Sequence, residues 1–248
     1  MRKWLILSFA LFLFAVHCFA AESKNVSYKS GDETVRGILY VPAGSGPFPA
    51  LIVIHEWWGL NDWVKDQASK LSDEGYVTLA IDLYRGKVAT TPDEAHEIMR
   101  GVPEDRAKRD LHAAFEFLGS QPNVKKKRIG AIGWCMGGGY SLDVALQEPA
   151  LAADVINYGH LATDTEALKK INAPILGLFG AQDRGITPDD VHKFQQTLQQ
   201  LGKKIDVKIY DDAGHAFENP NNKDGYRAAD TADAWKRTIE FLTTTLRQ

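Results

Sequence analysis

The sequence has 248 residues, of which 25% are charged and 44% are apolar or aromatic, and its formal net charge is −3. This composition is typical of a globular protein, and at this length folding buries roughly 70–75% of the surface of the unfolded chain, so no metal or disulfide is needed to stabilise a core. The charge provides no general attraction to phosphate backbones, and we expect no nucleic-acid partner. The basic run at residues 125–128 is interpreted as a solvated turn before a strand.

Residues 1–20 have the pattern of a cleavable signal peptide. A positively charged start is followed by apolar residues 4–16 and by a small-x-small cleavage site at residues 18–20, so cleavage would follow Ala20 or Ala21. The apolar stretch is shorter than a membrane span usually requires. We therefore expect an exported protein, periplasmic or secreted, and an uncleaved membrane anchor is the alternative interpretation.

From residue 34 onward, extended apolar segments alternate with segments of helical spacing. This alternation predicts an α/β fold with a doubly wound, mostly parallel sheet. The expected strands cover residues 34–41, 50–55, 76–81, 129–133, 154–158, 175–180 and 205–210. The expected helices cover residues 61–74, 103–118, 140–147, 188–201 and 225–246, and a further helix is expected within the insertion at 82–124. No segment is long enough for a second or cap domain, so residues 21–248 are predicted to form one domain.

The turn between the strand at 129–133 and the next helix has the pattern of a nucleophile elbow. Residues 133–137 read Gly-Trp-Cys-Met-Gly, which is G-x-nucleophile-x-G with cysteine in place of serine. Such a turn exposes the nucleophile at the sheet edge, and its glycines let neighbouring backbone pass without Cβ clashes. The helix N-terminus favours a negative charge on sulfur. Once the signal peptide is removed, Cys135 is the only cysteine, and we predict that it is the nucleophile.

Two later loops carry the partners that a cysteine nucleophile needs. Asp183 follows the strand at 175–180, and His215 follows the strand at 205–210. The order nucleophile, acid, histidine is that of the α/β-hydrolase fold, and the carboxyl ends of parallel strands meet at one sheet edge. We predict that Cys135 attacks the substrate, His215 takes and returns the proton, and Asp183 holds the imidazole tautomer.

Five motifs match those of one known family in order and approximate spacing. They are His-Glu-Trp-Trp-Gly-Leu at 55–60, Asp-Leu-Tyr-Arg-Gly at 82–86, Gly-Trp-Cys-Met-Gly-Gly at 133–138, Gly-Ala-Gln-Asp at 180–183 and Ala-Gly-His-Ala-Phe at 213–217. On these motifs the sequence resembles the dienelactone hydrolases, also called carboxymethylenebutenolidases. The resemblance implies a cysteine hydrolase that acts on small-molecule lactones or related esters through an acyl-thioester, without metal or organic cofactor.

The resemblance also implies roles for residues after the second and third expected strands. Glu56 matches a glutamate that pairs with the resting thiol and moves away when substrate arrives. A carboxylate beside a thiol either disfavours the thiolate or accepts its proton. The oxyanion hole is expected from the backbone N–H groups of Trp57 and Met136. Arg85 matches an arginine that binds a substrate carboxylate, and a surface arginine packed on Tyr84 is the alternative.

One departure from the family pattern affects the expected substrate. The family's best-known members carry a second arginine shortly after the histidine, whereas this sequence has Phe-Glu-Asn at 217–219. If Glu218 or Asn219 faces the pocket, a neutral or mono-anionic ester or lactone is favoured over a dianion. His160 follows another expected strand and either lines the pocket or faces solvent.

Other functional classes fit the sequence less well. A zinc-protease motif would need histidine at Gly59, so we expect no metal site. A non-catalytic binding protein of the same fold remains an alternative, although the complete triad argues against it. An exported thiol-redox protein would need a second thiol from elsewhere, because no CxxC pair is present.

Overall fold

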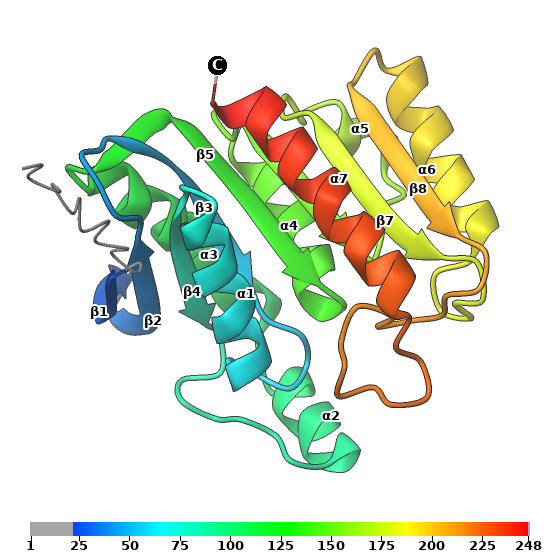
Figure 1. Cartoon of the computed structure of the whole chain (residues 1–248), viewed down its shortest axis with the longest axis horizontal. Helices are drawn as coiled ribbons and strands as arrows, with labels where there is room; N and C mark the ends of the chain where they lie inside the picture. Colours follow the sequence, from blue (N-terminus) through cyan, green and yellow to red (C-terminus); the bar gives the residue numbers. More distant parts are fainter. Residues whose placement is uncertain (1–21, 248) are drawn as a thin grey trace, which may run out of the picture.

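A computed structural model describes residues 22–247, so the predicted signal peptide lies outside the described residues. One eight-stranded sheet runs through this part of the chain in the order β1-β2-β4-β3-β5-β6-β7-β8 (Figure 1). Its strands are β1 (Glu22–Ser30), β2 (Glu33–Val41), β3 (Phe48–Ile54), β4 (Val77–Asp82), β5 (Val124–Trp134), β6 (Ala153–Asn157), β7 (Ile175–Gly180) and β8 (Ile205–Tyr210). The helices are α1 (Asp62–Asp73), α2 (Pro92–Arg100), α3 (Glu104–Ser120), α4 (Met136–Gln147), α5 (Thr165–Leu168), α6 (Pro188–Gln200) and α7 (Ala228–Leu246).

The sheet is antiparallel at one edge and parallel over the rest of its width. Strand β2 pairs antiparallel with both β1 and β4, and every pair from β4 to β8 is parallel. The predicted doubly wound, mostly parallel sheet is therefore confirmed. The carboxyl ends of the parallel strands share one edge, and helix α2 and the long loop before α7 lie at that edge (Figure 1). Open parallel sheets place their ligand sites at such an edge.

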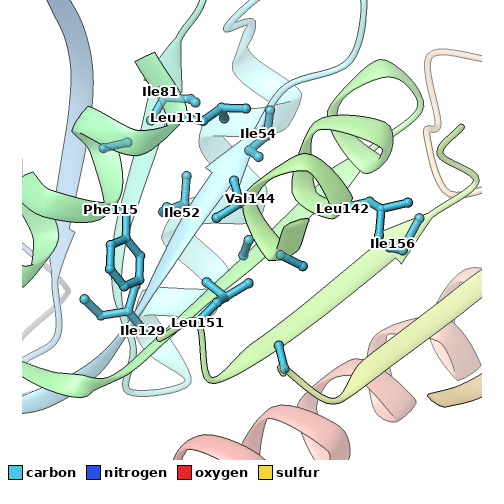
Figure 2. Close-up of a cluster of buried hydrophobic side chains, with 14 of the residues drawn as sticks. Ile52, Ile54, Ile81, Leu111, Phe115, Ile129, Leu142, Val144, Leu151 and Ile156 are labelled. Carbon is cyan, nitrogen blue, oxygen red and sulfur yellow. The ribbon is translucent and has the colours of Figure 1, made fainter. Parts of the chain in front are cut away.

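Helices cover both faces of the sheet and bury its two sets of alternating side chains. In β3, Ile52 and Ile54 pack in the cluster that contains the buried residues of α3, α4 and α6, as Figure 2 shows in part. Leu51 and Val53 point to the opposite face, where the buried residues of α1 and α7 pack. A strand buried on both faces has a continuous apolar sequence, which is why this part of the sheet could be predicted.

Two features of the sheet differ from the sequence-based expectation. Strand β1 was not predicted, because it is mostly polar and exposed and only Tyr28 contributes a large buried apolar side chain. The basic run at 125–128 is not a turn. It lies within β5, which begins at Val124, and its register with β3 shifts between Phe48 and Ala50. The three lysines of this run are exposed, so they extend the strand outside the core.

No helix within residues 22–247 is long and apolar enough to cross a membrane.

Candidate active site

The turn that carries Cys135 is a strained connection between β5 and α4. Cys135 has φ 55° and ψ −118°, backbone values that a residue with a side chain rarely adopts. Its backbone N–H donates to the carbonyl of Asn157 at 3.0 Å, which ties the turn to β6. A Cβ atom at Gly133 would collide with the carbonyl of Gly137, and one at Gly137 would collide with that of Ile54. The glycines are therefore required by close backbone contacts, and the turn directs the Cys135 side chain away from the sheet.

Three predicted residues form one continuous hydrogen-bonded chain. The Nε2 atom of His215 lies 3.1 Å from the Sγ atom of Cys135, and its Nδ1 atom lies 2.7 Å from Oδ2 of Asp183. The other carboxylate oxygen of Asp183 accepts the backbone N–H groups of Gly185 at 2.8 Å and Ile186 at 3.1 Å. Asp183 is only 5% exposed, so its carboxylate is held in one orientation and fixes the imidazole beside the sulfur.

The electrostatics of this chain favour a protonated imidazole. Burial on its own would lower the pKa of His215, but the hydrogen bonds to Asp183 and Cys135 outweigh burial and raise that pKa to about 10. Burial would likewise raise the pKa of Asp183, but the hydrogen bond to His215 and the two backbone N–H groups bring it below its usual value. Asp183 therefore remains a carboxylate and stabilises positive charge on the ring.

Glu56 is buried and lines the same cavity as Cys135 and His215. It is 2% exposed, accepts from Nδ2 of Asn219 at 2.6 Å and accepts from the hydroxyl of Tyr158 at 3.4 Å. Burial raises its pKa to about 7, although both hydrogen bonds oppose the shift. The pairing with the Cys135 thiol that the family resemblance implied for Glu56 is not observed, because the sulfur faces His215 instead.

The backbone N–H groups of Met136 and Trp57 are the two donors that the sequence analysis expected to form an oxyanion hole. Met136 is the first residue of α4, and Trp57 lies in the loop after β3. Among the hydrogen bonds of residues 22–247, neither backbone N–H has an acceptor. Gly137 sits directly against the carbonyls of Ile54 and His55, so the start of α4 and the end of β3 are in contact. Both N–H groups thus belong to segments that meet next to Cys135.

Two cavities meet at Cys135 and His215, because these two residues line both of them. The first, which we call the Trp57 cavity, has a volume of about 710 Å³. Its walls include Trp57, Trp58, His96, Asn219, Asn222 and Lys223. The second, which we call the α4 cavity, has a volume of about 490 Å³. Its walls include Met136, Tyr140, Leu142, Asp143, His160 and Ile186. Met99 of α2 lines both cavities.

Arg85 does not line either cavity. Its guanidinium lies 2.8 Å from Glu33 of β2 and 2.8 Å from Asp110 of α3. Asp110 is completely buried, so Arg85 compensates a charge in the protein interior. The structure gives no geometric support for the expected contact between Arg85 and a substrate carboxylate.

The two residues after Phe217 point in different directions. Asn219 lines the Trp57 cavity and holds Glu56. Glu218 instead accepts from the indole N–H of Trp134 at 3.2 Å and lines a different cavity together with Trp63. Of these two residues only Asn219 therefore lines the cavity that contains Cys135 and His215, and it places a neutral amide there.

Several contributions to the site were not predicted from the sequence. Tyr158 and Asn219, more than 60 residues apart in the sequence, together hold Glu56. His55 is fully buried, donates from Nδ1 to the carbonyl of Glu56 at 2.6 Å and accepts from the backbone N–H of Leu83 at 3.3 Å. Burial lowers the pKa of His55, and the neutral ring links the ends of β3 and β4. No local motif signals these long-range contacts.

Within residues 22–247, no group of three or more His, Cys, Asp or Glu side chains has the arrangement of a metal site.

Comparison with known proteins identifies relatives over nearly the whole described chain. The sequence model of the dienelactone hydrolase family matches residues 35–246. A protein from Methylorubrum extorquens that carries the provisional name carboxymethylenebutenolidase is 34% identical over 225 residues, which cover 85% of this chain and 77% of the relative. A relative from Aquifex aeolicus with the same provisional name is 30% identical and is covered over 98% of its length.

Solved structures agree with this assignment. A crystal structure from Klebsiella pneumoniae, provisionally named a dienelactone hydrolase, superposes with a TM-score of 0.82 at 26% identity, covering 91% of this chain and 99% of that one. A dienelactone hydrolase-like promiscuous phosphotriesterase from metagenomic libraries superposes with a TM-score of 0.85 at 24% identity, covering 92% and 99%. The second likeness shows the shared fold alone.

Proposed function

Since the chain belongs to the dienelactone hydrolase family and is therefore a carboxylic ester or lactone hydrolase, we propose that it works through Cys135, His215 and Asp183. The observation that carries the proposal is the continuous hydrogen-bonded chain from Asp183 through His215 to the sulfur of Cys135. That sulfur lines both cavities, so a bound ester can reach it from either side.

The proposed reaction has two halves. The Cys135 thiolate attacks the carbonyl carbon of the substrate, and the oxygen that becomes negative is stabilised by the N–H groups of Trp57 and Met136. The tetrahedral intermediate expels the alkoxide, which takes a proton from His215, and an acyl-thioester remains on Cys135. His215 then removes a proton from water, the hydroxide attacks the thioester, and the carboxylic acid leaves as the thiolate is restored.

We assign Glu56 a modulating role in this proposal. Its carboxyl is buried next to the catalytic residues, and its pKa of about 7 lets it gain or lose a proton near neutral pH. When Glu56 is ionised, its negative charge disfavours a second negative charge on a nearby sulfur. When it is neutral, that repulsion is absent. The proton on Glu56 would therefore influence how readily the Cys135 thiolate forms.

Export is the second part of the proposal, and it rests on the sequence of residues 1–20. We propose that this segment is a signal peptide and that the mature enzyme is periplasmic or secreted. The test is N-terminal sequencing of the protein recovered from the extracytoplasmic fraction of an expressing bacterium. A first residue at Ala21 or Glu22 supports the proposal, and recovery of the full chain beginning at Met1 in the membrane fraction supports an uncleaved anchor.

The test of the proposed mechanism is to trap the acyl-thioester. The mature enzyme is mixed with p-nitrophenyl acetate, quenched in acid and digested, and the peptide that contains Cys135 is examined by mass spectrometry. The expected result is one acetyl group on Cys135 and a burst of p-nitrophenol. The variant Cys135→Ala should show neither. Acetylation elsewhere, with turnover that survives in Cys135→Ala, would contradict the assignment.

A further inference from the structure

The cavity pair described above points to the shape and charge of the substrate. We propose, on the basis of the proposed function, that the natural substrates are open-chain esters with two arms, which are the acyl group and the alcohol group. The α4 cavity binds an arm that is uncharged or cationic, and Asp143 selects the end of that arm. A small lactone would occupy only the region around Cys135. Two cavities of about 710 and 490 Å³ on either side of that sulfur can accommodate a group on each side of the reacting carbonyl.

The α4 cavity is apolar close to the catalytic residues. Leu142, Ile186 and Met136 contribute aliphatic or thioether side chains to its walls. Helix α4 begins at Met136, directly after the nucleophile. Residues 136, 139, 140 and 143 follow the i, i+3, i+4, i+7 spacing of a single helix face, and all four line the cavity. A substrate arm that leaves Cys135 along this face therefore first meets apolar contacts.

Asp143 is the carboxylate at the far end of that face. It is half-buried and is the only Asp or Glu among the residues that line the cavity. The charged groups around it are Lys108, Glu104 and His160. Lys108 is already paired with Glu104 at 2.6 Å, and His160 lines the same cavity. No residue between 22 and 247 forms an ion pair with Asp143, which leaves its oxygens available to a ligand.

The length of the arm follows from helix geometry. Asp143 is eight residues after Cys135, which corresponds to about 12 Å along the axis, and helical side chains lean back towards the N-terminus. An extended chain advances about 1.2 Å per bond. An arm of roughly six to eight bonds beyond the reacting carbonyl would bring a terminal hydroxyl or ammonium group to the carboxylate.

The opposite cavity has a different set of charged groups. Lys223 lines the Trp57 cavity, and its ammonium group can donate hydrogen bonds to acceptors on a ligand. The amides of Asn219 and Asn222 also line it, but they already donate to Glu56 and to the carbonyls of His215 and Ala216. Asp224 and Glu56 also line this cavity, so it carries groups of both signs.

In the α4 cavity Asp143 is the only lining carboxylate and has no ion-pair partner among residues 22–247, although Lys108 and His160 lie near it. The far end of this cavity therefore favours a cationic arm over an anionic one. This asymmetry predicts which end of a substrate enters which cavity.

Two series of esters test the proposal. In one series the acyl arm ends in a methyl, a trimethylammonium or a carboxylate group at equal length, and in the other series the alcohol arm carries the same three ends. For the wild-type enzyme we expect kcat/KM to be about tenfold higher for the trimethylammonium than for the carboxylate ester in one of the two series, the size of effect typical of a partly exposed charge pair. In Asp143→Asn this preference should fall to below about threefold.

Two further variants make the result decisive. The control Asp189→Asn removes an exposed carboxylate of α6 that lines neither cavity, and it should retain the wild-type preference. Ala162→Phe narrows the α4 cavity at a half-buried position and should lower kcat/KM for long-armed esters of the same series more than it lowers kcat/KM for acetate esters. The inference is overturned if neither series shows a charge preference, or if Asp143→Asn leaves the preference unchanged. If the wild-type enzyme does not hydrolyse acetate esters at all, the proposed function itself is contradicted.

Discussion

At the scale of single residues, the buried carboxyl of Glu56 should make folding stability depend on pH. Its pKa is about 7 in the folded protein against an ordinary value of 4.5. The folded state therefore binds the proton more tightly than the unfolded chain does. The contribution of Glu56 to stability is then most favourable below pH 4.5, declines as pH rises from about 4.5 to 7, and is constant above that range.

The variant Glu56→Gln isolates this contribution because its amide does not ionise. We expect the free energy of unfolding of Glu56→Gln to rise relative to that of the wild type by about 3 kcal/mol between pH 4.5 and 7. Urea unfolding at a series of pH values measures the free energy of unfolding of both proteins. Subtracting one from the other cancels the contribution of other buried acids such as Asp154, whose pKa burial also raises. A difference that does not vary with pH would show that Glu56 titrates normally in the folded protein.

Arg85 provides a second prediction at this scale, and it separates a structural role from a substrate-binding role. Removing Arg85 leaves the fully buried Asp110 carboxylate without its ion-pair partner. We expect Arg85→Ala to reduce the free energy of unfolding by about 3 kcal/mol. The matched control Arg109→Ala loses only contacts to the exposed Glu33 and Asp105 and should cost less than about 1 kcal/mol.

The same variants can be tested with anionic and neutral esters. If Arg85 acts only through stability, the ratio of kcat/KM between carboxylate-bearing and neutral esters is the same in Arg85→Ala and in the wild type. If Arg85→Ala is instead as stable as the wild type and loses activity only towards carboxylate-bearing esters, the substrate contact that the family resemblance implied is supported.

At the scale of elements, the contact between α4 and the loop after β6 determines whether the nucleophile elbow can form. A Cβ atom at Gly138 would lie 2.7 Å from the carbonyl oxygen of Asn157 and 2.9 Å from the Cα atom of Gly159. The next residue differs, because a Cβ atom at Gly139 would meet nothing closer than 3.4 Å. Close backbone contacts therefore require glycine at position 138 but not at position 139.

These two positions form a matched pair for stability measurements. Gly138→Ala must displace backbone, so we expect it to destabilise the protein by about 2 kcal/mol or more. Gly139→Ala should be neutral or stabilising by up to about 1 kcal/mol, because alanine favours the helix. Thermal unfolding of both variants would detect the contrast. Equal effects at the two positions would contradict the close packing at the start of α4.

Elements also differ in how well their sequences predict them. The central parallel strands could be predicted because they have apolar residues on both faces, as Leu51 and Ile52 of β3 illustrate. The edge strand β8 could be predicted from its alternation of apolar and polar residues. Strand β1 could not be predicted, because its polar residues form an exposed edge of the sheet. This edge is held by pairing with β2 and by the stacking of Tyr28 on Phe117, whose ring centroids are 4.9 Å apart. Edge strands of this kind depend on tertiary contacts more than on their own pattern.

At the scale of the whole molecule, the sequence predicted which loops converge, but it did not predict the buried contacts of Glu56 and Arg85. The order of Cys135, Asp183 and His215, together with the parallel sheet, was enough to expect one cluster, and the structure brings their side chains within hydrogen-bond distance. The hydrogen bonds of Glu56 come from two distant segments, through Tyr158 and Asn219. The partners of Arg85 come from β2 and α3. Such contacts are properties of the complete fold and leave no local motif.

The two cavities also form only in the complete fold. Helix α4 lines one cavity and the loop that precedes α7 lines the other, while Met99 of α2 contributes to both. Three parts of the chain must therefore assemble around one sulfur before either arm of a substrate can bind. This dependence on assembly explains why the sequence indicated the chemistry of the site but not the two-sided shape of its pocket.

The proposed mechanism depends on the thiolate of Cys135, formed with His215, as the nucleophile. The most direct measurement is the rate of alkylation of Cys135 by iodoacetamide as a function of pH, recorded alongside loss of p-nitrophenyl acetate turnover, in the wild type, Glu56→Gln and His215→Ala. We predict that one alkyl group on Cys135 abolishes turnover, that Glu56→Gln is alkylated faster at neutral pH, and that His215→Ala is alkylated more slowly. Complete alkylation of Cys135 with turnover retained would contradict the account.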